Sequence, residues 1–493
     1  MDLQEYMQHD ATALAALVAD GSVTAAELLT LARERAAAVN PKINAIVTPM
    51  DAIADARTKE QLSGPFAGVP FLVKDLAQEY KGVATSYGSR ALRNDIAKEH
   101  STIVQRWLDA GLVIFGRTNA PEFGAKGITE PELFGPARNP WNLKHTTGGS
   151  SGGSGAAVAA RIVPAAGAND GGGSIRIPAA CNGLVGLKPS RGLTPYGPTY
   201  GEPLFGMSVQ GVVSISVRDN AGMLDVIAGP EVADEYLAAA HTQSFREQIQ
   251  QPPRKLRIGY SWDSAITASP DREAIAAVEG AAALLTELGH EVEQVKPPYD
   301  DDALARDFLT IWFAALAAQV AFAKERTGAK NSDFEADTLA IAELGRAGGA
   351  IKPAQALARR QDYLRSLLEF QQSYDIFLTP TLAKPPVKVG EIATPPALQK
   401  ASRAISALHG GKLLEKVSIL DQMIDENLGW VPYTQLANLT GRPAINVPLH
   451  WTDAGLPLGV QFVGGLGDDG LLLQLAAQLE TARPWAGRVA PVS

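Results

Sequence analysis

The most informative stretch of this 493-residue chain reads Gly148-Gly149-Ser150-Ser151-Gly152-Gly153-Ser154-Gly155, and the alanine-rich residues 156–160 follow it directly. A flexible linker has such a composition, but a linker would not lead straight into a helix-forming run. The Gly-Lys-Ser/Thr that ends a phosphate-binding P-loop is missing. The stretch therefore predicts a structured glycine loop at the start of a helix.

A second glycine-rich segment reads Asn169-Asp170-Gly171-Gly172-Gly173-Ser174-Ile175-Arg176, and its serine lies 24 positions after Ser150. Three glycines before a serine leave consecutive backbone N–H groups unshielded, and such a nest can bind a developing oxyanion. Ser174 would then attack the same carbonyl group. The alternative is a tight turn with a bystander serine, which the presence of two such loops makes the weaker interpretation.

A serine nucleophile needs a base, and the residues alone leave two candidates open. His145 is the nearest of seven histidines in sequence, but no acidic residue is obviously placed to orient it. Lys74 ends the apolar run Val69-Pro70-Phe71-Leu72-Val73. Burial there would lower its pKa and make the neutral amine a base. A lysine at a strand end can also extend its amine to solvent.

These segments resemble the amidase signature family of serine hydrolases. The matching pieces are Gly68-Val69-Pro70 through Lys74-Asp75, the two glycine loops, and Gly183-Leu184-Val185-Gly186-Leu187-Lys188-Pro189-Ser190. The match is strong over residues 64–218, moderate over 374–480, where it includes residues 437–444, and weak over 220–370. Amide hydrolysis without a metal or organic cofactor is the activity that this resemblance implies.

The resemblance also implies a role for each matching residue. Ser174 would be the acylated nucleophile, Ser150 a bridging serine after a cis bond from Gly149, and Lys74 the base. The oxyanion hole would consist of Gly171, Gly172, Gly173 and Ser174. The supporting residues would be Gly149, Ser151, Asp170 and Arg176.

Two positions depart from the family pattern. Asn169 stands where threonine or serine is common, and Gly171 where a larger residue is common; neither is expected to touch the triad. Residues 169–176 and 455–461 most resemble the branch of 6-aminohexanoate-cyclic-dimer hydrolases and aryl acylamidases. In the variable region, Trp312 and Phe313 either line a pocket for an apolar substrate or, more in keeping with helix residues, pack in the core.

The order of predicted elements indicates an α/β fold with a central mixed sheet flanked by helices. Thr24 and Glu27 form a predicted capping box, and Asn40-Pro41 is expected to end that helix. A predicted strand, helix and strand over residues 256–295 form a βαβ unit. We expect one domain over 1–493, with an N-terminal helical region (1–63), a core (64–218), a variable helical region (219–373) and a C-terminal part that completes the sheet (374–493).

Composition limits the classes of partner and location. Charged residues make up 20% of the chain and its formal net charge is −9, which disfavours nucleic acid as a partner. The uncharged run over residues 309–323 is shorter than the ~20 residues of a membrane helix. A single cysteine, Cys181, excludes an internal disulfide and a cysteine-based metal cluster. The chain starts with acidic and polar residues, unlike a signal peptide, which predicts a cytoplasmic enzyme. The resemblance implies a small amide as the substrate, and we expect that the enzyme can form a homodimer.

Three other readings remain. Residues 148–152 formally match the G-x-S-x-G elbow of α/β-hydrolases, but Asn139-Pro140-Trp141-Asn142 precedes them instead of a strand. An amidotransferase-type subunit that releases ammonia from glutamine for a partner chain would carry the same triad. A relative that cleaves carbamates or esters would carry it too.

Overall fold

A mixed sheet runs through the molecule. The computed structural model describes residues 1–239, 241–267, 269–395, 399–400, 403 and 424–492. Within them, eleven strands form one sheet in the order β1-β3-β2-β6-β8-β7-β12-β13-β11-β9-β10. The strands of this sheet are β1 (Ile46–Pro49), β2 (Pro70–Lys74), β3 (Val113–Thr118), β6 (Ala165–Asp170), β7 (Val185–Lys188), β8 (Val209–Ser214), β9 (Arg257–Tyr260), β10 (Glu291–Gln294), β11 (Ile376–Pro380), β12 (Ala444–Trp451) and β13 (Pro457–Val463). A hairpin, β4 (Arg138–Asn139) and β5 (Asn142–Thr146), lies apart from it.

The pairing of the strands confirms the predicted mixed sheet. β2 pairs in parallel with β3 and β6, and β9 pairs in parallel with β10 and β11. The other pairs, including β6 with β8 and β12 with β13, are antiparallel. Every residue of β2 and β6 is buried, so Lys74 and Asp170 end two fully buried neighbouring strands.

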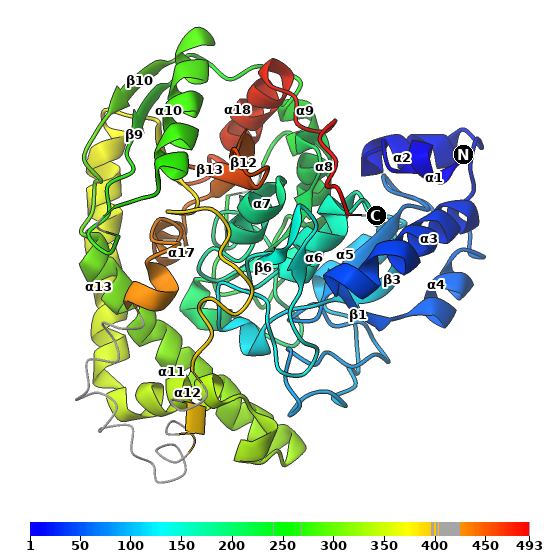
Figure 1. Ribbon diagram of the computed structural model, residues 1–493, viewed down its shortest axis with the longest axis horizontal. Coiled ribbons are helices and arrows are strands. Elements are labelled where there is room, and N and C mark those ends of the chain that lie inside the picture. The colour runs from blue at the N-terminus through cyan, green and yellow to red at the C-terminus, as the bar shows by residue number, and fades with distance from the viewer. Residues whose placement is uncertain (240, 268, 396–398, 401–402, 404–423, 493) are drawn as a thin grey trace.

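Helices cover the sheet and extend beyond it (Figure 1). Within the described residues the α-helices are α1 (Leu3–Tyr6), α2 (Ala11–Ala19), α3 (Ala25–Ile43), α4 (Asp51–Arg57), α5 (Thr102–Asp109), α6 (Gly152–Ala159), α7 (Arg176–Asn182), α8 (Val217–Ile227), α9 (Phe245–Gln248), α10 (Arg272–Glu287), α11 (Asp301–Thr327), α12 (Ala336–Gly348), α13 (Ile351–Gln371), α17 (Gln435–Thr440) and α18 (Asp469–Ala482). Figure 1 places α11–α13 on the side of the molecule away from α1–α4.

Helix α3 confirms one prediction and corrects another. Thr24 and Glu27 form the expected capping box. The helix does not end at Pro41, however, but continues to Ile43, with Asn44 in the left-handed region at φ 50°. Proline in the last turn costs one backbone hydrogen bond. Asn40 compensates, because its side-chain oxygen accepts from the N–H groups of Ala45 and Ile46, both at 2.8 Å.

Helix α11 is longer than the uncharged run inside it. Among the described residues it is the one helix long and apolar enough to cross a membrane by length and composition alone. The sequence argument that residues 309–323 are too short therefore does not hold for the whole helix. More than half of its apolar window is buried, and it packs against α12 and α13. Such burial is typical of a core helix.

Candidate active site

The first glycine loop connects β5 to α6, so a strand does precede it, contrary to the expectation from residues 139–142. The backbone conformation of the loop is unusual. The Gly149–Ser150 peptide bond is cis, as the resemblance implies. A Cβ atom at Gly149 would lie 2.6 Å from the carbonyl carbon and oxygen of Ile128. Only glycine fits against that backbone, which therefore restricts the position of Ser150.

Lys74 lies at the centre of the site and is fully buried. Its Nζ atom is 2.7 Å from Ser150 Oγ and 2.7 Å from Asn169 Oδ1. Burial lowers the pKa of Lys74 well below its usual value, and the negative charge of Asp170 offsets that only in part. The lysine does not extend to solvent. Asn169 touches the lysine, so the expectation that it would lie apart from these residues is wrong.

The second glycine loop follows β6 and carries Ser174, which is 7% exposed. Among the described residues, the N–H groups of Gly171, Gly172 and Ser174 have no hydrogen-bond acceptor. The N–H of Gly173 instead donates to Asp170 Oδ1 at 2.6 Å. The expected row of four converging donors is therefore interrupted at Gly173, because the carboxylate engages that amide.

The two loops lie against each other. Ser151 Oγ donates to the backbone oxygen of Asn169 at 3.3 Å. A Cβ atom at Gly148 would meet the Ile177 side chain at 3.0 Å. The loop that carries Ser150 thus contacts the chain both before and after Ser174.

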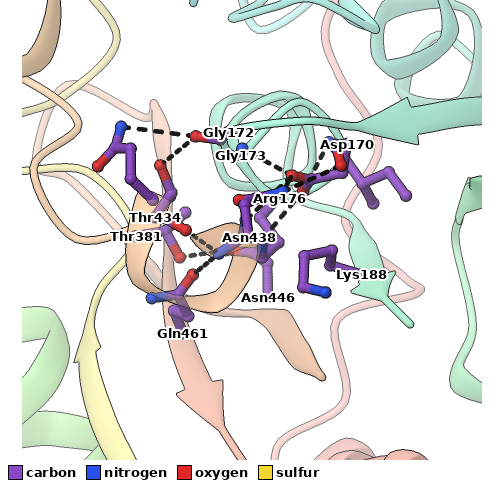
Figure 2. A network of polar contacts seen from close by, with 12 residues as sticks. Asp170, Gly172, Gly173, Arg176, Lys188, Thr381, Thr434, Asn438, Asn446 and Gln461 are labelled. Carbon is purple, nitrogen blue, oxygen red and sulfur yellow. Dashed lines mark hydrogen bonds and ion pairs between the residues drawn. The ribbon is translucent and has the colours of Figure 1, made fainter. Parts of the chain in front are cut away.

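A buried ion pair supports the second loop (Figure 2). Asp170 accepts two hydrogen bonds from Arg176, both at 3.0 Å, and both side chains are fully buried. Asn438 on α17 donates to Asp170 Oδ1 at 2.9 Å. Burial alone would raise the pKa of Asp170, but the charge and hydrogen bonds of Arg176, together with the Asn438 hydrogen bond, lower it. Asp170 is therefore a carboxylate that holds the Gly173 amide.

The C-terminal part of the chain completes this network with residues that sequence reasoning did not assign. Arg176 donates to the Thr434 carbonyl at 2.8 Å, to Asn438 Oδ1 at 2.6 Å and to Gln461 Oε1. Thr434 Oγ1 donates to the carbonyl oxygen of Gly172 at 2.7 Å. Asn438 and Gln461 lie in segments that match the family pattern. That match was the one sequence feature that could have assigned these two residues to the site.

Lys188, also drawn in Figure 2, is a second buried lysine close to this pair. Its amine donates to the Pro189 carbonyl at 2.6 Å. Burial, joined by the nearby charge of Arg176, lowers the pKa of Lys188 to about 7.

The rival candidates lie elsewhere. His145 Nδ1 is 2.6 Å from the carbonyl oxygen of Pro386, and neither Ser150 nor Ser174 is a hydrogen-bond partner of its ring among the described residues. Phe313 is buried in the core. Trp312 is only partly buried, and a Cβ atom at Gly171 would meet its ring at 3.3 Å. Trp312 thus lies beside the second glycine loop, and Phe313 packs in a buried apolar cluster.

No group of three or more His, Cys, Asp or Glu side chains in the described part of the chain is arranged to hold a metal ion.

The amidase family model matches residues 27–473 of this chain. The 6-aminohexanoate-cyclic-dimer hydrolase of Pseudomonas sp. (strain NK87) is 36% identical over 97% of this chain and 96% of its own length. The acylamidase of Rhodococcus erythropolis is 34% identical over 97% and 96%, respectively. A solved structure of a 6-aminohexanoate cyclic dimer hydrolase superposes with a TM-score of 0.90, at 34% identity and 99% coverage of both chains. The α/β-hydrolase reading is thereby excluded, and the chain belongs to the amidase family, the amidase signature enzymes that hydrolyse carboxylic amide bonds.

Proposed function

We propose that this chain hydrolyses small amides through an acyl-enzyme on Ser174, with Ser150 as the bridging serine and Lys74 as the base. The observation that carries the proposal is the 2.7 Å contact between the buried Lys74 amine and Ser150 Oγ. A buried amine with a lowered pKa is neutral in a larger fraction of molecules, and only the neutral amine accepts a proton.

The proposed proton route balances at each step. Ser174 Oγ forms a bond to the acyl carbon and passes its proton to Ser150 Oγ, which gives its own proton to Lys74 Nζ. When the tetrahedral intermediate breaks down, the carbonyl re-forms and the C–N bond breaks. Lys74 Nζ then returns a proton to Ser150 Oγ, which gives its own proton to the leaving amine nitrogen. Water then forms a bond to the acyl carbon and passes a proton through Ser150 to Lys74 Nζ. The bond between that carbon and Ser174 Oγ breaks, Ser174 regains its proton through Ser150, and the carboxylic acid leaves.

The negative oxygen of each tetrahedral intermediate needs hydrogen-bond donors. We assign this role to the N–H groups of Gly171, Gly172 and Ser174, which have no acceptor among the described residues. In well-studied enzymes, each preorganised donor of this kind lowers the activation barrier by ~3–4 kcal/mol. Gly173 would act indirectly, because its amide ties the loop to Asp170.

Apolar side chains beside the loop support substrates with a hydrocarbon or aryl group. A Cβ atom at Gly171 would lie 2.5 Å from Leu204, and one at Gly172 would lie 2.6 Å from Phe308. The rings of Phe308 and Trp312 are 5.4 Å apart. The relatives named above act on a cyclic amide dimer or on acylamides, and we propose linear, aryl or cyclic small amides for this chain.

A substrate screen with the purified chain alone tests the proposal. Anilides, aliphatic amides, cyclic amide dimers and glutamine are compared, with the Ser174→Ala variant as the control. We expect hydrolysis of at least one amide class, no requirement for a second chain, and a loss of several orders of magnitude in the variant. If the chain alone hydrolyses none of these amides, and hydrolyses glutamine only when a partner chain is added, the result would instead favour the amidotransferase reading.

Two further parts of the proposal concern the setting of the enzyme. We propose a reducing compartment such as the cytoplasm, because Cys181 is a free, buried thiol and the fold does not depend on a disulfide bond. We also propose that the enzyme can form a homodimer, because large apolar side chains such as Phe322 and Ile351 are exposed on α11 and α13. Cell fractionation and light scattering test these two points.

A further inference from the structure

Asn169 is the second partner of the Lys74 amine. It is the last residue but one of β6, the strand that pairs with the strand bearing Lys74. Its Oδ1 atom lies 2.7 Å from Lys74 Nζ, the same distance as Ser150 Oγ. Among the described residues, these two oxygens are the hydrogen-bond partners of the amine.

The orientation of the Asn169 carboxamide is determined by its other contact. Its Nδ2 group donates to the carbonyl oxygen of Leu76 at 2.8 Å. Because a carbonyl oxygen can only accept, the NH₂ group must face Leu76 and the amide oxygen must face Lys74. An amide oxygen can only accept as well, so the lysine must donate to it. A threonine or serine hydroxyl at this position could donate or accept.

A neutral amine has two N–H groups and one lone pair. One N–H directed to Asn169 leaves the lone pair available for the proton of Ser150, whose hydroxyl can donate. We propose that Asn169 is a positioning residue that orients the Lys74 amine toward Ser150 and stabilises the ammonium formed when the proton arrives. This inference rests on the proposed function, because it presupposes that Lys74 acts as the base.

The charges around the amine make the neutrality of Asn169 important. Asp170 follows directly and is paired with Arg176. Arg117 on β3 donates to the Lys74 carbonyl at 3.2 Å and lies 3.9 Å from Asp75, which is buried beside Lys74. The neutral amide adds a hydrogen bond to this site without adding a charge.

The test compares the wild type with Asn169→Asp, Asn169→Ala and Asn169→Thr in the pH dependence of kcat/KM on one amide. In Asn169→Asp, a carboxylate would stabilise the Lys74 ammonium, which cannot act as a base. The acid limb of the kcat/KM profile, where activity falls as the pH is lowered, should therefore move up by ~1–3 pH units, and activity should recover at high pH. Alanine removes an acceptor, so the limb should move to lower pH while kcat falls by ~10-fold or more. Threonine should restore part of the lost rate.

Acid limbs that coincide in wild type, Asn169→Asp and Asn169→Ala would overturn the inference, since a purely structural residue lowers activity without moving them. Thermal unfolding of each variant identifies those that fold. If Asn169→Asp and Asn169→Ala do not fold, the acid limb of Asn169→Thr is compared with that of the wild type instead. Labelling of Ser174 by phenylmethylsulfonyl fluoride separates the two proposals. If wild-type Ser174 is not labelled, the proposed function fails. If it is labelled with the same pH dependence in every variant, only the role of Asn169 fails.

Discussion

At the residue scale, the position of Lys74 at the end of an apolar run predicted a strand-end lysine, but not whether it is buried. Burial depends on the neighbouring strands β3 and β6, which come later in the chain. The contact with Asn169 could not be predicted for the same reason, because strand register brings the two side chains together. The loops around Ser150 and Ser174 were predictable, since their glycines carry a local signal.

The choice of base can be tested with a pair of single variants. Lys74→Ala should lower amide hydrolysis by ~10²-fold or more, because the general base is lost. His145→Ala should leave activity near the wild-type level, because its ring binds the Pro386 carbonyl. Lys74→Arg should not rescue, since a guanidinium cannot take up a proton at working pH. Steady-state rates of these variants on one anilide show which residue is the base. An inactive His145→Ala variant together with an active Lys74→Ala variant would refute the assignment of Lys74.

At the element scale, the period of apolar residues and the caps predicted part of the helices and strands, including the capping box of α3 and the βαβ unit of β9, α10 and β10. The order of strands in the sheet did not follow from local patterns. β12 and β13 lie between β7 and β11 although they are the last strands of the chain. This arrangement brings α17 and Gln461 to the ion pair of the second loop.

Removal of one partner of the buried ion pair should strongly destabilise this junction. Arg176→Met leaves Asp170 as a buried, unpaired carboxylate, which should cost ~3–5 kcal/mol. The exposed pair of Arg254 with Asp375 provides the control, and Arg254→Met should cost less than ~1 kcal/mol. Thermal unfolding of both variants measures the difference. Equal losses would show that the Arg176 pair does not hold the loop to α17.

At the scale of the whole molecule, carboxylates join the N-terminal helices to the C-terminal one. Glu480 on α18 accepts from the Val217 N–H at the start of α8. Asp219 on α8 accepts from the Ala11 N–H of α2 at 2.6 Å. Burial, with the charges of Asp10 and Asp219 nearby, raises the pKa of Glu480 to about 7. These contacts join helices from opposite ends of the sequence and make this junction sensitive to pH.

The raised pKa of Glu480 predicts a pH-dependent stability. An acid whose pKa is ~4.3 in the unfolded chain and about 7 in the folded chain favours folding at low pH. Its contribution is complete below pH ~4 and is lost as the pH rises to 7. Glu480→Gln should therefore raise the melting temperature relative to wild type more at pH 8 than at pH 5. The exposed Glu279→Gln is the control, and a difference for Glu480→Gln that does not change with pH would contradict the prediction.

The acyl-enzyme on Ser174 is the central claim, and rapid quenching of the wild-type enzyme during turnover of an anilide tests it most directly. Proteolysis and mass spectrometry then locate the acyl group. We predict an acyl adduct on Ser174 in the wild type, with neither an adduct nor measurable turnover in Ser174→Ala. An adduct on Ser150 instead, or near-wild-type turnover by folded Ser174→Ala, would contradict this account.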